Sequence, residues 1–284
     1  MLLKKLIIKC LNYFDSVTQQ KVTVSVGDIV NLRTEIENNQ FLLTTRLLDI
    51  EDYCERSIQT FNWQNTISRK AYGEKHREQD GNNAFSKLIK SYQEKGYDSS
   101  SYFVVDSELR LLDGNHRMGM NLYMGIYKIN VRVLKRKSRN PKAVDWYLKV
   151  GLDTEFIKSV ADKFKMLQQK MMDTGNVFCA VVPTENLAKD ISFLARDTRI
   201  DQYTDLPDNK IWGGGSIPSR GVLIRFTLYD PQYYVKDGKV ISKRAEEIGK
   251  VIRLRTDDTV IITKNCLEGR QLFEIISPYF GKGE

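Results

Sequence analysis

Apolar and polar side chains alternate along the chain with periods that predict both strands and helices. In the first half, four short segments are predicted to be strands, and residues 21–26 show the two-residue period typical of one. The predicted strands are residues 21–26, 102–105, 109–112 and 128–134. Helices are predicted from apolar residues at helical spacing at 42–54 and 85–96. A further helix is expected to begin near His116 and to end at Gly125, a typical C-cap residue.

The second half shows the same mixture. Its strongest helical pattern covers residues 156–172, and helices are also predicted at 184–195, 240–250 and 266–276. The predicted strands are residues 177–182, 221–229 and 259–263. Alternating strands and helices are typical of an α/β unit. We therefore predict an α+β or α/β protein, in which a first domain is followed by a smaller α/β domain.

Changes in composition indicate where the chain divides. Residues 135–142 form a basic run that contains Pro141, and we predict the domain boundary there. The predicted parts are an amphipathic helix at residues 1–20, a first domain at 21–137, and a second domain, of unknown role, at 143–284. Residues 62–83 lack a clear pattern and are predicted to be an insertion, as either a surface loop or a helical excursion.

Composition and charge narrow the class of partner. The chain has 44 Lys and Arg against 36 Asp and Glu, a formal net charge of +8. This charge favours an anionic partner, whether a nucleotide, a phosphorylated metabolite or nucleic acid. The 4 cysteines lie far apart without a C-x-x-C pair, and there are only 2 histidines. Neither a zinc site nor a disulfide framework is therefore supported.

Apolar stretches in the chain are short. None approaches the roughly 18 consecutive apolar residues that a membrane span needs, so no transmembrane segment is expected. The N-terminal residues are basic and apolar but lack the cleavage pattern of a secretory signal. With dispersed cysteines and no signal of export, we expect a cytoplasmic protein.

Candidate chemistry concentrates in the stretch Asp113-Gly114-Asn115-His116-Arg117, between a predicted strand and a predicted helix. Gly114 allows the backbone to approach a ligand closely. The first N–H groups of the following helix, at the positive end of its dipole, suit an anion. Arg117 adds a forked donor that matches phosphate. These residues predict an anion-binding turn.

Several residues of this turn have a structural interpretation as well as a functional one. Asp113 could hold a metal ion, orient its neighbours or cap the helix. His116 could donate to phosphate or transfer a proton, or form a structural hydrogen bond. Arg117 could instead form a surface salt bridge, and Asn115 could shape the turn with a positive φ.

Residues 20–135, without 62–83, resemble the ParB/sulfiredoxin superfamily. The resemblance rests on the turn D-G-N-H-R and on its position after a helix and a strand pair, with a helix ending in glycine and a strand behind it. The resemblance implies a ParB/sulfiredoxin-like domain whose turn binds nucleotide phosphates. It assigns phosphate binding to Asp113, Gly114, Asn115, His116 and Arg117.

The branches of this family differ in chemistry. Sulfiredoxins have a nucleophilic cysteine in the turn, where this chain has Asn115, so thiol chemistry is not expected. Chromosome-partitioning ParB proteins bind CTP and carry a helical DNA-binding region, whereas residues 143–284 alternate strands and helices; nuclease-like relatives remain an alternative. The turn is most similar to that of free-serine kinases, which have the pattern D-G-x-H-R.

Similarity to the kinase branch implies further roles. Mg²⁺ would bridge the phosphates beside Asp113, and a glutamate near the start of the fold would act as base toward a hydroxyl group. Glu35 and Glu37 are the two candidates for that base, and His116 is a further catalytic candidate.

The resulting hypothesis is a phosphotransferase that moves phosphate between a nucleotide (ATP, ADP or CTP) and a small hydroxylated metabolite. Two alternatives stay open. One is a ParB-like DNA-binding protein or nuclease, favoured by the basic run at 135–142 and the positive net charge. The other is a nucleotide sensor without catalytic activity.

Overall fold

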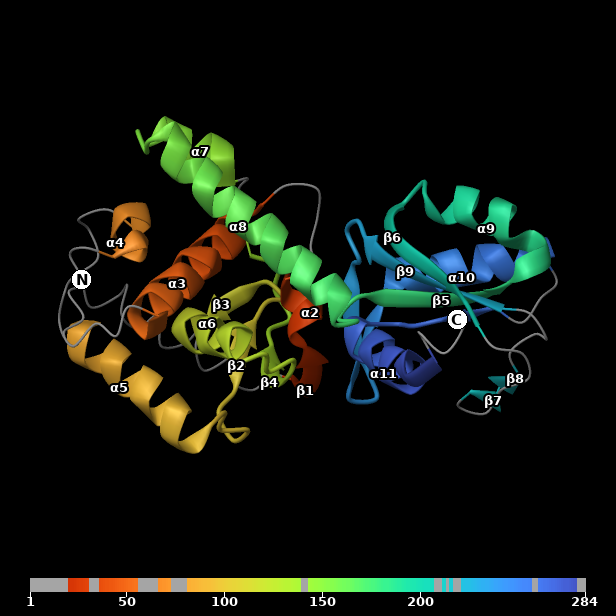
Figure 1. Cartoon of the computed structure of the whole chain (residues 1–284), viewed down its shortest axis with the longest axis horizontal. Helices are drawn as coiled ribbons and strands as arrows, with labels where there is room; N and C mark the ends of the chain where they lie inside the picture. Colours follow the sequence, from red (N-terminus) through yellow and green to blue (C-terminus); the bar gives the residue numbers. More distant parts are fainter. Residues whose placement is uncertain are drawn as a thin grey trace. The chain divides into compact units, whose positions relative to one another are not determined.

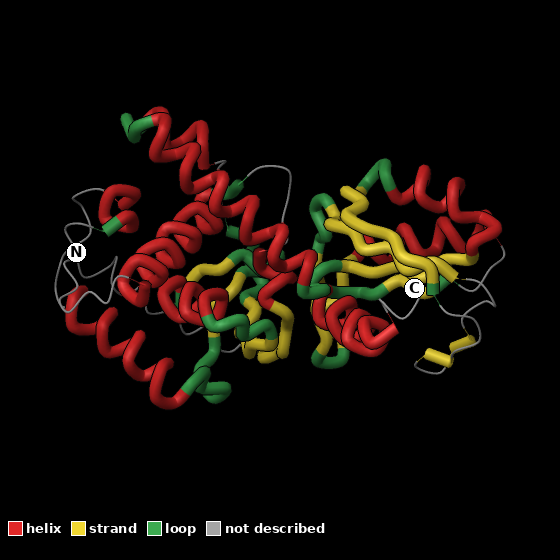
Figure 2. Tube along the Cα trace, viewed as in Figure 1, coloured by secondary structure: helices red, strands yellow, loops and turns green. Residues whose placement is uncertain are grey.

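The protein consists of two compact units, each of mixed helices and strands (Figures 1 and 2). The computed structural model describes residues 20–30, 36–55, 66–72, 81–138, 143–206, 211–212, 215–216, 221–256 and 260–279. Unit 1 comprises Met1–Thr23 and Ile36–Lys165, and unit 2 comprises Val24–Glu35 and Met166–Glu284. Segments from two separate parts of the sequence therefore build each unit.

The sheet of unit 1 has the strand order β1-β4-β2-β3. The strands are β1 (Gln20–Ser25), β4 (Lys128–Val133), β2 (Phe103–Val105) and β3 (Leu111–Asp113). β2 runs parallel to β4 and antiparallel to β3. Along β4, Ile129 and Val131 are buried while Lys128 and Arg132 are exposed, as the pleat of a strand requires. One face of the sheet therefore packs into the core and the other meets solvent.

The helices of unit 1 pack mainly on one another. They are α3 (Asn38–Glu55), α4 (Ile67–Tyr72), α5 (Gly81–Lys95), α6 (Asn115–Tyr123), α7 (Ala143–Lys149) and the first part of α8 (Thr154–Asp173). Ile50, Phe85, Ile89 and Met120 meet in one buried cluster. Where α3 crosses α6, a Cβ at Gly119 would lie 2.8 Å from the Ile50 side chain, so the bare glycine lets the two helices pack closely.

Part of the predicted insertion at 62–83 is a docked helix. α4 begins where the Asp49 carboxylate accepts the N–H groups of Ile67 and Ser68, at 2.7 and 3.1 Å. Ser68 is fully buried and Ala71 nearly so. At these residues the segment is thus a helix capped by a side chain of α3, and not a solvated loop.

Unit 2 contains a sheet of order β12-β5-β9-β6 in which neighbouring strands are antiparallel. The strands are β12 (Ile261–Ile262), β5 (Phe178–Pro183), β9 (Gly221–Leu228) and β6 (Thr198–Asp205). All residues of β5 and β9 are buried. Helices of this unit are α9 (Leu187–Leu194), α10 (Lys243–Thr256) and α11 (Cys266–Ile276). The short hairpins are β10 (Tyr233–Lys236) with β11 (Lys239–Ser242) and β7 (Ile211–Trp212) with β8 (Gly215–Ser216).

The short helix α2 (Val26–Val30) belongs to unit 2 although it precedes α3 in the sequence. Its Asp28 is fully buried and accepts hydrogen bonds from Cys266 N at 2.7 Å, Ser25 N at 3.1 Å and the Tyr233 hydroxyl at 3.2 Å. Burial raises the pKa of Asp28 to about 6, although these hydrogen bonds oppose the shift. Asp28 therefore connects α2 to the start of α11.

Most predicted elements of regular pattern are confirmed, with shifted ends. The predicted helix at 240–250 is wrong in its first part, because Lys239–Ser242 forms β11 and the helix begins at Lys243. α7, β6 and β10 were not predicted. Residues 1–19 of the predicted N-terminal helix lie outside the described residues.

The boundary between the two compact units also differs from the domain boundary predicted at 135–142. It falls between Lys165 and Met166, inside α8. α7 and the first half of α8 pack on α3, since the Phe41 ring lies 4.2 Å from that of Tyr147 and 6.3 Å from that of Phe156. Among the described helices, none is both long and apolar enough to cross a membrane.

Candidate anion-binding site

The turn between β3 and α6 has the predicted strand–turn–helix geometry. β3 ends at Asp113, Gly114 is left-handed with φ 98° and ψ 20°, and α6 begins at Asn115. A Cβ at Gly114 would lie 2.7 Å from Cδ1 of Phe103, on the neighbouring strand. Both the positive φ and this close contact require glycine here.

The N-terminus of α6 has no side-chain cap. Gly114 is the N-cap residue, and its carbonyl accepts the N–H of Met118 at 2.8 Å, which closes the first turn. A helix leaves its first N–H groups without partners inside the helix, and a side chain usually accepts at least one of them. In this case the positive end of the helix faces the turn without such an acceptor, which suits a bound anion.

Asn115, the first residue of α6, has a buried side-chain oxygen. Its Oδ1 has no hydrogen-bond partner among the described residues, although the residue as a whole is half-buried. A buried polar atom without a partner costs about 1–3 kcal/mol. The oxygen and nitrogen of an amide can be exchanged by rotating the side chain, so Asn115 can offer a ligand either an acceptor or a donor.

Arg117 lies across the start of β2. Its Nη1 donates to the Ser101 hydroxyl and its Nη2 to the Tyr102 carbonyl at 3.1 Å, while Cζ lies 4.9 Å from the centre of the Phe103 ring. No described carboxylate forms an ion pair with it, so the surface salt bridge is not present. A guanidinium has five N–H donors, and these contacts use two. Arg117 is thus held in place with donors remaining for an anion.

His116 is half-buried, with its ring edge-on to Phe85 at 5.2 Å. Burial lowers its pKa to about 3, and the positive charge of Arg46 lowers it further in the same direction. The imidazole is therefore neutral near pH 7. Any contact that His116 makes with a phosphate would be a neutral hydrogen bond, without a positive charge.

Asp113 is exposed, and its side chain forms no hydrogen bond or ion pair with the described residues. It does not cap α6, since the N-cap position belongs to Gly114. The described residues contain no group of three side chains able to hold a metal ion. Mg²⁺ is commonly held by one or two carboxylates together with phosphate oxygens, so Asp113 fits an ion shared with a ligand but not one held by protein alone.

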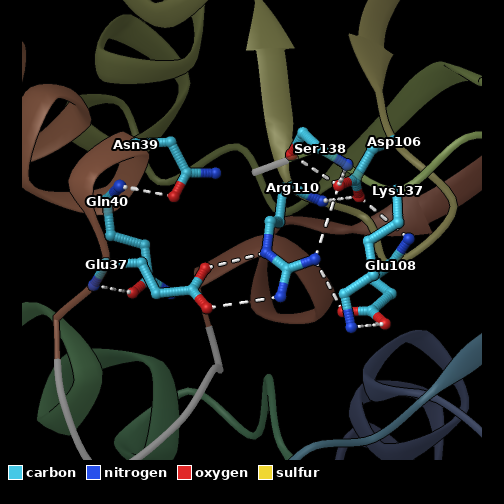
Figure 3. A network of polar contacts seen from close by, with 8 residues as sticks. All are labelled: Glu37, Asn39, Gln40, Asp106, Glu108, Arg110, Lys137 and Ser138. Carbon is cyan, nitrogen blue, oxygen red and sulfur yellow. Dashed lines mark hydrogen bonds and ion pairs between the residues drawn. The ribbon is translucent and has the colours of Figure 1, made fainter. Parts of the chain in front are cut away.

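Glu37, the described member of the two candidate bases, lies in a buried polar network in unit 1 (Figure 3). Its Oε2 accepts from Arg110 Nε at 3.0 Å and its Oε1 from Arg110 Nη2 at 3.4 Å. The Gln40 side chain accepts the Glu37 N–H at 3.0 Å, which fixes the start of α3. Glu37 is thus one partner of a two-pronged Arg–carboxylate pair. Glu35 lies outside the described residues.

Asp106, fully buried, organises the other side of this network. Its Oδ1 accepts the N–H groups of Glu108 and Arg110, both at 2.9 Å. Its Oδ2 accepts the Ser138 N–H at 2.8 Å and the Ser138 hydroxyl at 2.7 Å. Glu108 pairs with both Arg110 and Lys137. The network therefore ties the β2–β3 turn to α3 and to the residues after β4.

Sequence reasoning did not single out Arg110 or Asp106. A signal was present for Asp106, which stands in a short polar turn between the two predicted strands, where an Asp often accepts backbone N–H groups. The structure thus places the residues of the turn together, and Glu37 in a separate network centred on Arg110.

Comparisons with known proteins add little to this geometry. No protein family matches the sequence, and no curated protein matches it significantly. Among solved structures, the chain is similar to a Pnob8-like ParB-N domain, with 12% sequence identity, 92% of this chain and 71% of that chain covered, and a TM-score of 0.24. A TM-score this low supports no argument about function. The chain is a mixed α/β protein whose function must be argued from its site.

Proposed function

We propose that the turn Asp113–Arg117 binds the phosphates of a nucleotide, and that the protein moves a phosphoryl group between this nucleotide and a small hydroxylated metabolite. One observation supports binding above all others: the uncapped N-terminus of α6 follows a left-handed Gly114 and has the Arg117 guanidinium beside it. Backbone N–H groups, a helix dipole and a forked cation are the usual parts of a phosphate site.

Each residue of the turn has a part in this proposal. The first N–H groups of α6 and the free donors of Arg117 bind phosphate oxygens. Asn115 pairs its buried amide with the ligand, and the neutral His116 donates a hydrogen bond. Asp113 would hold a Mg²⁺ ion bound together with the nucleotide, and the ion would supply positive charge during transfer.

The base in the proposed transfer is Glu35 or Glu37, and of these two Glu37 lies within the described residues. Two hydrogen bonds from Arg110 hold the Glu37 carboxylate in one position. If Glu37 takes the proton of the acceptor hydroxyl, Glu37→Gln lowers kcat by at least about 100-fold while nucleotide affinity stays unchanged. A variant that turns over like the wild type excludes Glu37 as base.

A nucleotide screen tests the proposal. The affinities of ATP, ADP and CTP are measured by titration calorimetry with Mg²⁺, and products are detected by mass spectrometry with a panel of hydroxylated metabolites. Arg117→Ala is expected to abolish binding. The control is Arg196→Ala, which removes an exposed arginine that also lies over an aromatic ring, that of Phe193 at 5.8 Å. Unchanged binding in Arg117→Ala would refute the proposal, and binding without any product would indicate a nucleotide sensor.

The role of Asp113 is tested separately. Asp113→Asn removes the charge of an exposed side chain without partners among the described residues, so the fold is unaffected. We expect Mg²⁺ to increase the nucleotide affinity of the wild type and of Asp145→Asn, an exposed carboxylate of α7, but not that of Asp113→Asn. An equal response to Mg²⁺ in all three proteins would exclude Asp113 as its ligand.

Nucleic-acid binding is the second candidate, because Lys135, Arg136 and Lys137 are exposed directly after β4. Lys137 already pairs with Glu108, which reduces the free charge. Filter binding of duplex DNA across a salt series distinguishes this candidate. Its affinity would fall steeply with salt, with a slope of about −0.9 per phosphate contacted. A DNA affinity that does not change with salt would exclude nucleic-acid binding through phosphates.

A further inference from the structure

The solvent face of the unit 1 sheet continues from the turn onto β2 and β4. Asp113 is the register partner of Val104 on β2, and Val104 is the partner of Arg132 on β4. Side chains directly opposite on neighbouring strands lie on the same face. Adjacent strands are about 4.8 Å apart, so Asp113 and Arg132 are separated by roughly 10 Å across this face.

Two cations lie over the Tyr102 ring at the start of this face, and a third contacts the Tyr102 backbone. Lys21 Nζ lies 5.1 Å from the centre of the Tyr102 ring, and Arg132 Cζ lies 5.3 Å from it. Arg117 Nη2 donates to the Tyr102 carbonyl at 3.1 Å. The three side chains come from β1, β4 and α6, so the fold gathers them from distant parts of the sequence.

No described carboxylate forms an ion pair with Lys21 or Arg132, and both are exposed. A cation over an exposed aromatic ring gains only about 0.5–1 kcal/mol, which holds the side chain in place without neutralising its charge. The Asp98 carboxylate accepts hydrogen bonds from the Ser100 N–H and hydroxyl at 2.9 and 2.7 Å. These bonds, and to a smaller extent the positive charge of Arg117, lower the pKa of Asp98. Like charges repel, so this arrangement favours an extended anion that contacts all three cations.

The N-terminus of α6 would hold one phosphate of the nucleotide. We propose that Lys21 and Arg132 bind the further phosphates of the same nucleotide. The site then selects nucleoside triphosphates and diphosphates over monophosphates. This inference rests on the proposed nucleotide-binding role of the turn. Arg132 supplies a planar fork and Lys21 a compact charge, and both are usual phosphate ligands. Tyr102 holds the two side chains over its ring, and its carbonyl accepts a hydrogen bond from Arg117.

The test compares affinities within one nucleotide series. Calorimetry with Mg²⁺ measures the mono-, di- and triphosphates of adenosine and of cytidine with the wild type, Lys21→Gln, Arg132→Gln and the double variant. The control is Lys158→Gln, an exposed lysine of α8. Because the replaced side chains are exposed, melting temperatures should match that of the wild type.

We expect the wild type to bind a triphosphate at least about tenfold more tightly than the monophosphate. In the double variant this preference falls to about threefold or less, while monophosphate affinity is unchanged. Two results would overturn the inference and leave the proposed function intact. One is a preference for the triphosphate that persists in the double variant, and the other is an equal loss of affinity for the monophosphate and the triphosphate. A wild type that binds no nucleotide overturns both.

Discussion

At the scale of single residues, Arg117 and Arg110 show how differently one side-chain type can be used. Arg110 is buried and shared between the carboxylates of Glu37, Asp106 and Glu108. Its role is to hold three parts of unit 1 together. Arg117 is half-buried, lacks a carboxylate partner among the described residues, and is held by neutral groups. Only the second keeps its charge for a ligand.

His116 gives a prediction about pH. Its pKa is about 3 in the folded protein and ordinarily 6.5, so below pH 6.5 the unfolded chain takes up a proton that the folded protein does not. The stability that comes from burying a neutral His116 is therefore fully present above pH 6.5. It is lost as the pH falls from 6.5 toward 3, and the free energy of unfolding decreases by at most about 1.4 kcal/mol per pH unit. In urea unfolding, the wild type should lose more stability between pH 7.5 and 5 than His116→Gln. A stability difference that does not change with pH would contradict the burial of a neutral His116.

At the scale of elements, how closely a helix packs on its neighbour determines which residue is tolerated at a helical glycine. A Cβ at Gly269, in α11, would lie 1.8 Å from the Val177 carbonyl oxygen, so α11 can pack on the start of β5 only with glycine there. Gly249, in α10, has a different environment. The nearest atom to its Cβ would be the flexible end of Arg253 at 3.3 Å.

These two helical glycines form a matched pair. Gly269→Ala should lower the free energy of unfolding of the protein by about 1–3 kcal/mol or more, because the backbone must move apart. Gly249→Ala should raise it by about 0.5–1 kcal/mol, because alanine favours the helix. Denaturant unfolding measures both changes. Similar effects of the two substitutions would show that α11 does not approach β5 so closely.

Apolar periodicity predicted the elements with long, regular patterns. It predicted α5, α8 and α11 from their helix period, β4 from its alternation, and β5 and β9 from their largely apolar runs. It missed β6, whose sequence Thr198–Asp205 is mostly polar and mostly exposed. It also assigned Val240 to a helix, although Val240 and Ile241 pair with β10 as a hairpin. Pairing partners at a distance determine such segments, and a local pattern does not contain them.

The candidate site was predictable in part for the same reason. The turn at 113–117 is continuous in sequence, so its geometry could be predicted from Gly114 and the elements beside it. The Arg110 network and the cations at Tyr102 join residues more than 70 positions apart, such as Glu37 and Arg110 or Lys21 and Tyr102. No spacing rule connects such residues before the strand order is known.

At the scale of the whole molecule, the chain passes between the two units more than once. The chain passes from unit 1 to unit 2 at Val24, within β1, contributes α2 to unit 2, and returns to unit 1 at Ile36, before α3. α2 buries Val26, Ile29 and Val30, and its Asp28 accepts the first N–H of α11. The second unit therefore depends on a segment from near the start of the sequence.

This dependence predicts how fragments behave. A fragment of residues 166–284 should lack a cooperative thermal transition, because Tyr233 and Cys266 lose the buried acceptor Asp28. Joining residues 24–30 to its N-terminus through a Gly/Ser linker should restore the transition. The same linked fragment with Asp28→Ala serves as the control and should not show it. A cooperative transition in the short fragment alone would refute the structural role of α2.

The central claim is that the N-terminus of α6 binds a nucleotide phosphate. The most direct measurement is a titration followed through backbone amide resonances by NMR, with a nucleotide and with the corresponding nucleoside. We predict that a nucleoside triphosphate moves the amide signals of Gly114, Asn115, His116 and Arg117 most, and that the nucleoside, which lacks phosphate, does not. If these four signals stay in place while the nucleotide binds elsewhere, or if no signal moves, the turn is not a phosphate site.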